Sequence, residues 1–352
     1  RYISIMGSLY VLALFANQIT ISAILGLLLG AWFIWKPPEI SIKGLKGIGK
    51  HLKISQYTAG TLSSLASNVP EAVIVGLAFY RSIVTNNYEL MEIGLIMILG
   101  TIGMNLILLG IVVIIGAKGG YVDVPKEALE YDIELYRFVF VGVFALLSYF
   151  VAHAFFLIGT EEHLVVKIPW YFSLILFISY PLYLGLSPKG ASGIVESDLP
   201  PKTSLIYFIL GNMGIFLGGE LIVSNVEEIL LHMRSEIAVY VDPIVFIAII
   251  LAALGAIPEH FVAVKAARRG EVDIALGNLL GGISQIFLLI LAGIGIFIEI
   301  PLDKYTLFQL LIVGLQMWFI KRSILDDQKL DTFEGAMIIL FQLLAFALLI
   351  TS

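Results

Sequence analysis

The sequence predicts an all-α polytopic membrane protein, in which about eleven transmembrane helices form an inverted 5+5 repeat preceded by one extra helix. Three observations predict this fold. Hydrophobic residues make up 59% of the 352 residues, and charged residues only 14%. Apolar runs long enough to cross a bilayer recur along the chain. A Pro-Glu pair also stands within two of these runs, one in each half of the sequence.

The composition excludes several classes of protein. A soluble chain of this length could not cover its surface with so few charges, so the apolar excess must face lipid. The absence of cysteine excludes disulfides and thiolate metal sites. The formal charge of −6 comes without a basic run suited to nucleic acid. The first residues enter an apolar stretch without a cleavage-type ending, so we expect a span there and not a removable signal peptide.

The spans were assigned from apolar runs, since a helix needs about 20 residues to cross the hydrocarbon core. Residues 2–35 as one helix would be about 50 Å long, so a tight turn at Asn17-Gln18 is expected to separate two spans. The predicted spans lie near 3–16, 19–35, 55–82, 90–117, 137–160, 168–186, 203–230, 241–268, 272–298, 304–320 and 332–351.

The basic residues support this count. With eleven spans, 17 of the 21 lysines and arginines fall on one side of the membrane. The positive-inside rule expects such an asymmetry when the count is correct. We therefore predict a cytoplasmic N-terminus and an external C-terminus, and the short loops favour a prokaryotic cell membrane. The four basic residues on the other side are Arg81, Lys167, Arg234 and Lys304.

The two Pro-Glu pairs, at Glu71 and Glu259, occupy matching places in the two halves. Arg81 and Arg269 each follow the glutamate by ten residues. With residues 1–18 as the extra helix, five spans lie in residues 19–186 and five in residues 203–352, joined by a cytoplasmic linker at 187–202. An odd number of spans per half forces opposite orientations, which is the plan of secondary transporters with broken helices at the midplane.

Polar side chains surround these glutamates at helical spacing. Each proline frees backbone carbonyls beside its glutamate, and such carbonyls are tolerated in a membrane where they line a cavity. We therefore expect the breaks and the polar faces to belong to one site. The polar faces comprise Thr61, Ser64, Asn68 and Glu71 in the first half, Thr101 and Asn105 on the span at 90–117, and Asn278, Gly281 and Gln285 on the span at 272–298.

These paired spans resemble the cation/calcium exchanger superfamily over nearly the whole chain. The second half is similar to its proton/calcium exchanger branch, in which Glu-His and a downstream Ser-x-Gln or Ser/Thr-Gln are typical; here these are Glu259-His260 and Ser284-Gln285. The first half matches through Asn68 and Glu71, and through Gly100 with Asn105. Family members usually carry Gly-Asn before the glutamate, whereas this chain has Ser67-Asn68 and Gly255-Ala256, so the second half lacks one amide.

The resemblance implies a secondary active antiporter that exchanges Ca²⁺ for H⁺ and needs no cofactor. It implies that Glu71 and Glu259 bind Ca²⁺ in competition with protons, and that Asn68, Asn105 and Gln285 complete or gate the site. His260 is as well suited to a supporting role as to a direct one, and Glu220 to close helix packing as to an access path. The candidates for transport or gating are His260, Ser64, Thr101, Ser284, Asn278 and Glu220.

Elementary chemistry fits this implication. Ca²⁺ takes about 6–8 oxygen ligands, which carboxylates, amides, freed carbonyls and water can supply. Without the cation, two carboxylates at the midplane repel each other and lack solvation, so their protonation is favoured. The main alternative is Na⁺/Ca²⁺ exchange, with or without K⁺; Gln285 and His260 in place of further carboxylates favour protons. A cation channel fits less well because channels usually assemble their pores from several subunits. An intramembrane enzyme lacks a catalytic set such as His-Glu-x-x-His.

Overall fold

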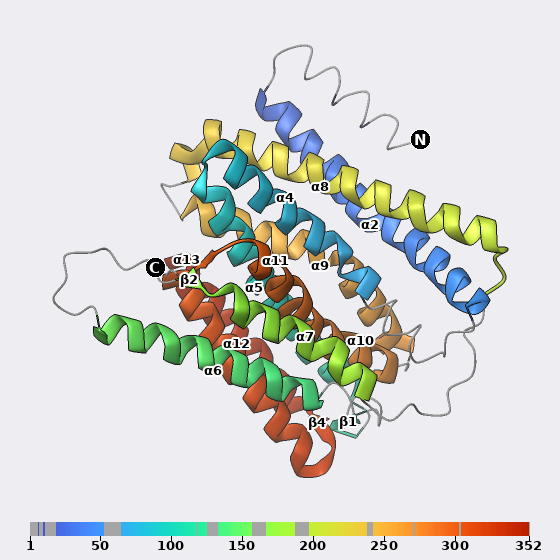
Figure 1. The fold of residues 1–352 in the computed structure, drawn as a ribbon. Helices are drawn as coiled ribbons and strands as arrows, with labels where there is room; N and C mark the ends of the chain where they lie inside the picture. Colours follow the sequence, from blue (N-terminus) through green and yellow to red (C-terminus); the bar gives the residue numbers. More distant parts are fainter. Residues whose placement is uncertain are drawn as a thin grey trace. The chain divides into compact units, whose positions relative to one another are not determined.

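The computed structural model describes residues 6, 10, 19–52, 65–117, 119–124, 133–156, 167–186, 197–237, 242–269, 272–302 and 304–351. The extra helix predicted within residues 1–18 therefore lies outside the described ranges. Within them the chain forms eleven α-helices, one π-helical segment and four short strands (Figure 1). Seven helical stretches within the described residues are long and apolar enough to cross a membrane, one of them formed by α10, η2 and α11 together, and two shorter helices are also apolar. The all-α polytopic prediction is confirmed.

The chain divides into two compact units, and each takes segments from both predicted repeats. The first unit combines Arg1–Met97 with Lys189–Pro258, and the second combines Ile98–Pro188 with Glu259–Ile350. A division by contacts thus cuts across the repeat boundaries at 19–186 and 203–352. Those boundaries concern sequence symmetry and stay a prediction.

The first unit contains two unusually long helices, α2 (Ile19–His51) and α8 (Pro201–Ile237), which run side by side in opposite directions (Figure 1). Glycines bring their backbones together. A Cβ atom added at Gly44 would collide with the backbone nitrogen of Phe208, and one at Gly218 would lie 3.0 Å from the carbonyl oxygen of Gly30. Such close approach at small residues is common where helices associate in membranes. Lipid chains are as apolar as the helix surfaces, so the hydrophobic effect does not drive the helices together and close packing must do so.

The helix that carries the span predicted near 19–35 does not end there, because α2 continues through Pro37 and Pro38 to His51. The packing explains this. A Cβ atom at Gly214 would meet the Pro37 ring at 2.6 Å, so α8 is in close contact with α2 at the point where proline weakens the helix. The helix α4 (Val69–Thr85) packs against α8 in the same unit. Residues 53–64, the first part of the predicted span at 55–82, lie outside the described residues.

Helix α5 (Tyr88–Gly116) begins in the first unit and α9 (Pro243–Arg269) ends in the second. The helices not yet described belong to the second unit. The spans predicted at 90–117 and 332–351 agree with α5 and α13 to within two residues. The helices of the second unit are α6 (Ile133–Phe156), α7 (Trp170–Leu186), α10 (Val272–Gln285), the π-helical η2 (Ile286–Leu291), α11 (Ala292–Phe297), α12 (Lys304–Asp327) and α13 (Thr332–Thr351).

Two short pairs of strands, which were not predicted from the sequence, connect loops between the helices of the second unit. Strand β1 (Tyr121–Asp123) pairs antiparallel with β4 (Lys329–Asp331), with Val122 opposite Leu330. Strand β2 (Lys167–Ile168) pairs antiparallel with β3 (Ile300–Pro301). Each pair joins two loops that the count of eleven spans puts on the same side of the membrane.

Candidate functional site

Glu71 lies in the first turn of α4, where the predicted break in the helix is confirmed. The backbone nitrogen of Asn68 donates to the carbonyl of Leu65 at 3.1 Å, and α4 begins at the next residue. Pro70 follows in the first turn, where its missing N–H removes no helical hydrogen bond. The carboxylate thus stands at the end of α4 that carries the positive end of the helix dipole.

Glu71 and Asn68 are both buried, with 0% and 1% of their surfaces exposed. The side chain of Glu71 packs against α9 at Gly255. A Cβ atom at Gly255 would lie 3.3 Å from Cγ and 3.5 Å from Oε1 of Glu71, and 3.4 Å from Cε of Met97. Gly255 stands one helical turn before Glu259 in α9. In the sequence Gly255 stands out only as a departure from the family pattern, and no sequence signal indicates this contact.

The second predicted break is not found, because α9 runs as one helix from Pro243 through Pro258 to Arg269. Proline inside a helix removes one hydrogen bond, but a helix held by its neighbours in a membrane can continue past it. The side chains of Glu259 and His260 lie outside the described residues, as does Ser64. Among the described side chains, no three His, Asp or Glu residues come together to hold a metal.

The amides and hydroxyls predicted in the second unit are mostly buried. Thr101 and Asn105 lie one turn apart on α5 with 0% exposure, and Ser284 on α10 has the same exposure. Asn278, also on α10, is half-buried. The Ser284 hydroxyl donates to the carbonyl of Leu280 at 3.5 Å.

Gln285, the last residue of α10, is held by a partner that the sequence analysis did not identify. Its Nε2 donates to the hydroxyl of Tyr180 on α7 at 2.8 Å, and both side chains are buried. The π-helical segment Ile286–Leu291 follows directly. Such segments are rare and occur frequently at functional sites, because the wider turn changes the direction of the side chains beside it. Neither feature has a sequence signal in a uniformly apolar run.

Glu220, on α8, forms an ion pair with Arg81 of α4. Arg81 also pairs with Glu227 at 3.0 Å, and its NH2 group donates to the Ser224 hydroxyl at 2.7 Å. A Cβ atom at Gly219 would meet Val73 of α4 at 2.6 Å. Glu220 therefore lies where α4 packs tightly on α8, and its charge is paired with Arg81.

A family model described as "Sodium/calcium exchanger protein" matches residues 22–188 and 203–351, which is nearly the whole chain. The chain belongs to the sodium/calcium exchanger family. It is therefore a membrane transporter of the cation/calcium exchanger superfamily and not an enzyme. The resemblance seen in the sequence is confirmed at the level of the superfamily, and the two matched segments flank the predicted linker.

Known proteins of similar sequence and structure agree with this family. An uncharacterised membrane protein of Methanocaldococcus jannaschii is 25% identical over 329 residues, covering 91% of this chain and 95% of its own. The crystal structure of an H⁺/Ca²⁺ exchanger, CAX, matches with a TM-score of 0.70 at 16% identity, covering 99% and 91% of the two chains. A structure of a sodium-calcium exchanger, NCX_Mj, matches with a TM-score of 0.61 at 22% identity, covering 93% and 99%. At these identities the two structures establish the fold of this exchanger-family chain.

Proposed function

We propose that this chain is a secondary active antiporter that exchanges Ca²⁺ for H⁺ by alternating access. The observation that carries the proposal is Glu71, a fully buried carboxylate at a helix break inside a membrane protein. A charged side chain at such depth is costly and is retained mainly for function. Asn68, an amide residue, is the N-cap residue of the same helix, and the side chain of Glu71 packs against α9 at Gly255.

The cation site would combine Glu71 and Glu259 with three amides, Asn68, Asn105 and Gln285. Two carboxylates neutralise a dication, and amide and backbone carbonyl oxygens are the further ligands that Ca²⁺ accepts. Within the Gln285 amide, the atom that can coordinate a cation is Oε1, because Ca²⁺ takes oxygen ligands, while Nε2 donates to Tyr180. Thr101, Ser284, Asn278, Ser64, His260 and Glu220 remain candidates for transport or gating.

Protons are the favoured coupling ion for a reason of charge. When the cation leaves, the carboxylates of the proposed site must be neutralised, and a proton does so without any additional ligand. A site that also binds Na⁺ would be expected to contain further carboxylate ligands, whereas Gln285 contributes a neutral amide. The sodium-coupled alternative has support from the likeness to NCX_Mj, whose fold this chain also shares.

Flux measurements separate the two. Calcium uptake into proteoliposomes should be driven by a pH gradient with sodium absent. Uptake that requires a sodium gradient would refute Ca²⁺/H⁺ exchange and favour Na⁺/Ca²⁺ exchange. Glu71→Gln and Glu259→Gln should each abolish uptake because each removes a charge that the dication needs. Glu39→Gln is the matched control, since Glu39 is exposed on α2 and pairs only with Lys36 in the described structure. Substantial transport by Glu71→Gln would remove this residue from the core of the site.

We also propose a cell-membrane location with the N-terminus inside. The absence of cysteine in the sequence makes the test direct. Lys167→Cys, in β2, should react in intact cells with a maleimide that cannot cross membranes. Lys329→Cys, in β4, should react only after the cells are permeabilised. The opposite labelling pattern would invert the orientation.

A further inference from the structure

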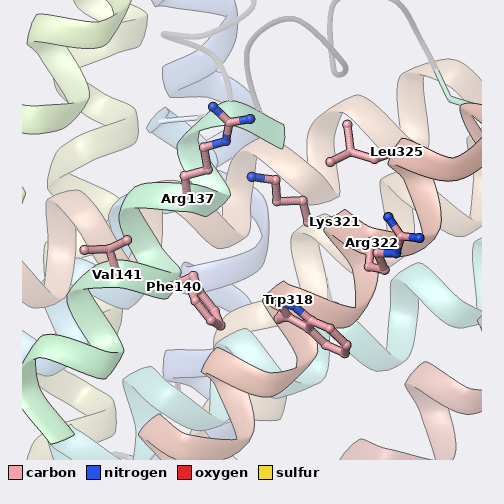
Figure 2. A pocket seen from close by; sticks show the side chains of 7 residues that line it. All are labelled: Arg137, Phe140, Val141, Trp318, Lys321, Arg322 and Leu325. Atoms are coloured by element: carbon pink, nitrogen blue, oxygen red, sulfur yellow. The ribbon is translucent and has the colours of Figure 1, made fainter. Parts of the chain in front are cut away.

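A cavity of about 300 Å³ opens between α6 and α12 in the second unit, and its lining includes no residue of the proposed cation site (Figure 2). The lining joins cationic and apolar side chains. Helix α6 contributes Arg137, Phe140 and Val141, and α12 contributes Trp318, Lys321, Arg322 and Leu325.

The charges in this cavity are not balanced. Arg137 pairs with Glu134 at 2.9 Å, and Arg322 pairs with Asp326 at 3.0 Å, each within its own helix. Lys321 has no carboxylate within ion-pair distance among the described residues. Figure 2 shows Arg137 and Lys321 extending toward one another from opposite walls. Two cations that face the same space repel each other. An anion bound between them would replace this repulsion with two attractive, charge-assisted contacts.

The apolar part of the lining faces outward. Val141, Trp318 and Leu325 are 62%, 53% and 52% exposed, and all three lie on helices that are long and apolar enough to cross a membrane. In a bilayer these surfaces contact lipid chains. One lipid molecule can match both parts of the lining, with its headgroup at the cations and an acyl chain along the apolar wall, whereas a small free anion would match only the cations.

The position of the two cations along their helices places the cavity near the membrane interface. Arg137 lies four residues after the start of α6, and Lys321 lies six residues before the end of α12. At 1.5 Å per residue both cations are about 6–9 Å from the helix ends, near the boundary between headgroups and acyl chains. Tryptophan is enriched at this boundary, and basic pockets between helices on the cytoplasmic side bind anionic headgroups.

We propose that this cavity binds an anionic phospholipid, with its phosphate between Arg137 and Lys321 and an acyl chain along Val141, Trp318 and Leu325. Arg322 adds a third positive charge at the rim. The cytoplasmic side predicted for all three cations is the leaflet in which anionic lipids are recognised by clustered basic residues.

Trp318 provides a direct test. A variant with Trp32, Trp35 and Trp170 changed to Phe leaves Trp318 as the single tryptophan. Reconstituted into vesicles, it is titrated with phosphatidylglycerol or phosphatidylcholine whose acyl chains carry bromine, which quenches tryptophan on contact. We expect brominated phosphatidylglycerol to quench at a roughly five-fold or more lower mole fraction, since each basic residue near the surface contributes about a factor of five. Equal quenching by the two lipids would overturn the proposal.

Charge variants locate the preference. In the single-tryptophan background, R137Q/K321Q should remove the preference for phosphatidylglycerol, and R137K/K321R should keep it. The matched control is K43Q/K46Q, which removes two exposed cations from α2 and should leave the preference unchanged. A preference that persists in R137Q/K321Q contradicts the proposal.

Two further measurements separate a bound lipid from a free anion and test the chain without substitutions. Millimolar inorganic phosphate that abolishes quenching by brominated phosphatidylglycerol would assign the cavity to a free anion and overturn the lipid assignment. Native mass spectrometry is applied to the unaltered chain, purified with an equal mixture of the two lipids. We expect retained phosphatidylglycerol in excess over phosphatidylcholine, and equal retention would contradict the proposal.

Discussion

Gly255→Ala should weaken Ca²⁺ binding while leaving the fold intact. The added methyl group would lie 3.3 Å from Cγ of Glu71 and 3.4 Å from Cε of Met97, closer than most carbon contacts. Glu71 must then move by a few tenths of an ångström or turn away from α9. Overpacking of this kind costs about 1–3 kcal/mol. Part of the cost is offset, because alanine favours a helix interior over glycine by about 1 kcal/mol.

The remaining 0–2 kcal/mol, an approximate range, corresponds to a loss of up to about thirty-fold in apparent Ca²⁺ affinity if it acts on Glu71. The affinity is measured by calcium titration of the purified protein and by uptake into proteoliposomes. Gly76→Ala is the control, since it lies on the same helix as Glu71 and a Cβ atom there meets nothing within 4 Å. An unchanged affinity in Gly255→Ala would show that the position of Glu71 against α9 does not matter for the site.

Two further substitutions test contacts that hold helices around the site. Arg81→Gln should lower the free energy of unfolding by about 1–2 kcal/mol, since it removes the cation with which both Glu220 and Glu227 pair; the value lies between those of exposed and buried pairs. Thermal unfolding in detergent measures this loss, and Arg81→Lys should restore only part of it because lysine lacks the forked geometry. Tyr180→Phe should cost about 1–3 kcal/mol by removing the buried hydrogen bond that Nε2 of Gln285 donates to the Tyr180 hydroxyl. If Gln285 is a ligand, Ca²⁺ titration of Tyr180→Phe should show a loss of affinity as well, and an unchanged affinity would argue against that role.

The helices were largely predictable because hydropathy is a physical requirement of the membrane. The span predicted at 332–351 coincides with α13, which begins where the charged residues before it give way to an apolar run. The end of α2 was not predictable from this signal. Charged residues and two prolines after residue 35 indicate a stop, but contact with the glycines of α8 keeps the chain helical to His51. The strands β1 to β4 also depend on partners far away in the sequence.

The candidate site was predictable where a polar residue interrupts an apolar run. Glu71, Asn68, Thr101 and Asn105 are all buried, and their joining in one cation site stays a prediction. The contacts that position them were not predictable. Gly255 and Tyr180 are ordinary residues in apolar helices, and their importance comes only from which side chain each one meets. One sequence cannot show these pairings, since helix periodicity gives the faces of a helix but not the neighbour of each face.

The two Pro-Glu pairs look alike in sequence but have different backbone settings, and this difference makes a further prediction. Pro70 lies in the first turn of α4, where an N–H would have no helical partner in any case. Pro258 lies inside α9, so it denies the carbonyl of Leu254 its helical hydrogen bond, one residue before Gly255. That carbonyl can replace the amide that the second half lacks at Ala256.

Pro258→Ala should therefore stabilise α9, by up to about 3 kcal/mol, and yet weaken Ca²⁺ binding, because the Leu254 carbonyl would now accept a hydrogen bond from residue 258. Pro70→Ala should change both quantities much less. Thermal unfolding and calcium titration of the two variants give the comparison. Equal effects of the two substitutions on affinity would show that the carbonyl is not used, and that the prolines act alike. An increase in stability together with a loss of affinity in Pro258→Ala alone would identify the backbone of α9 as the missing ligand.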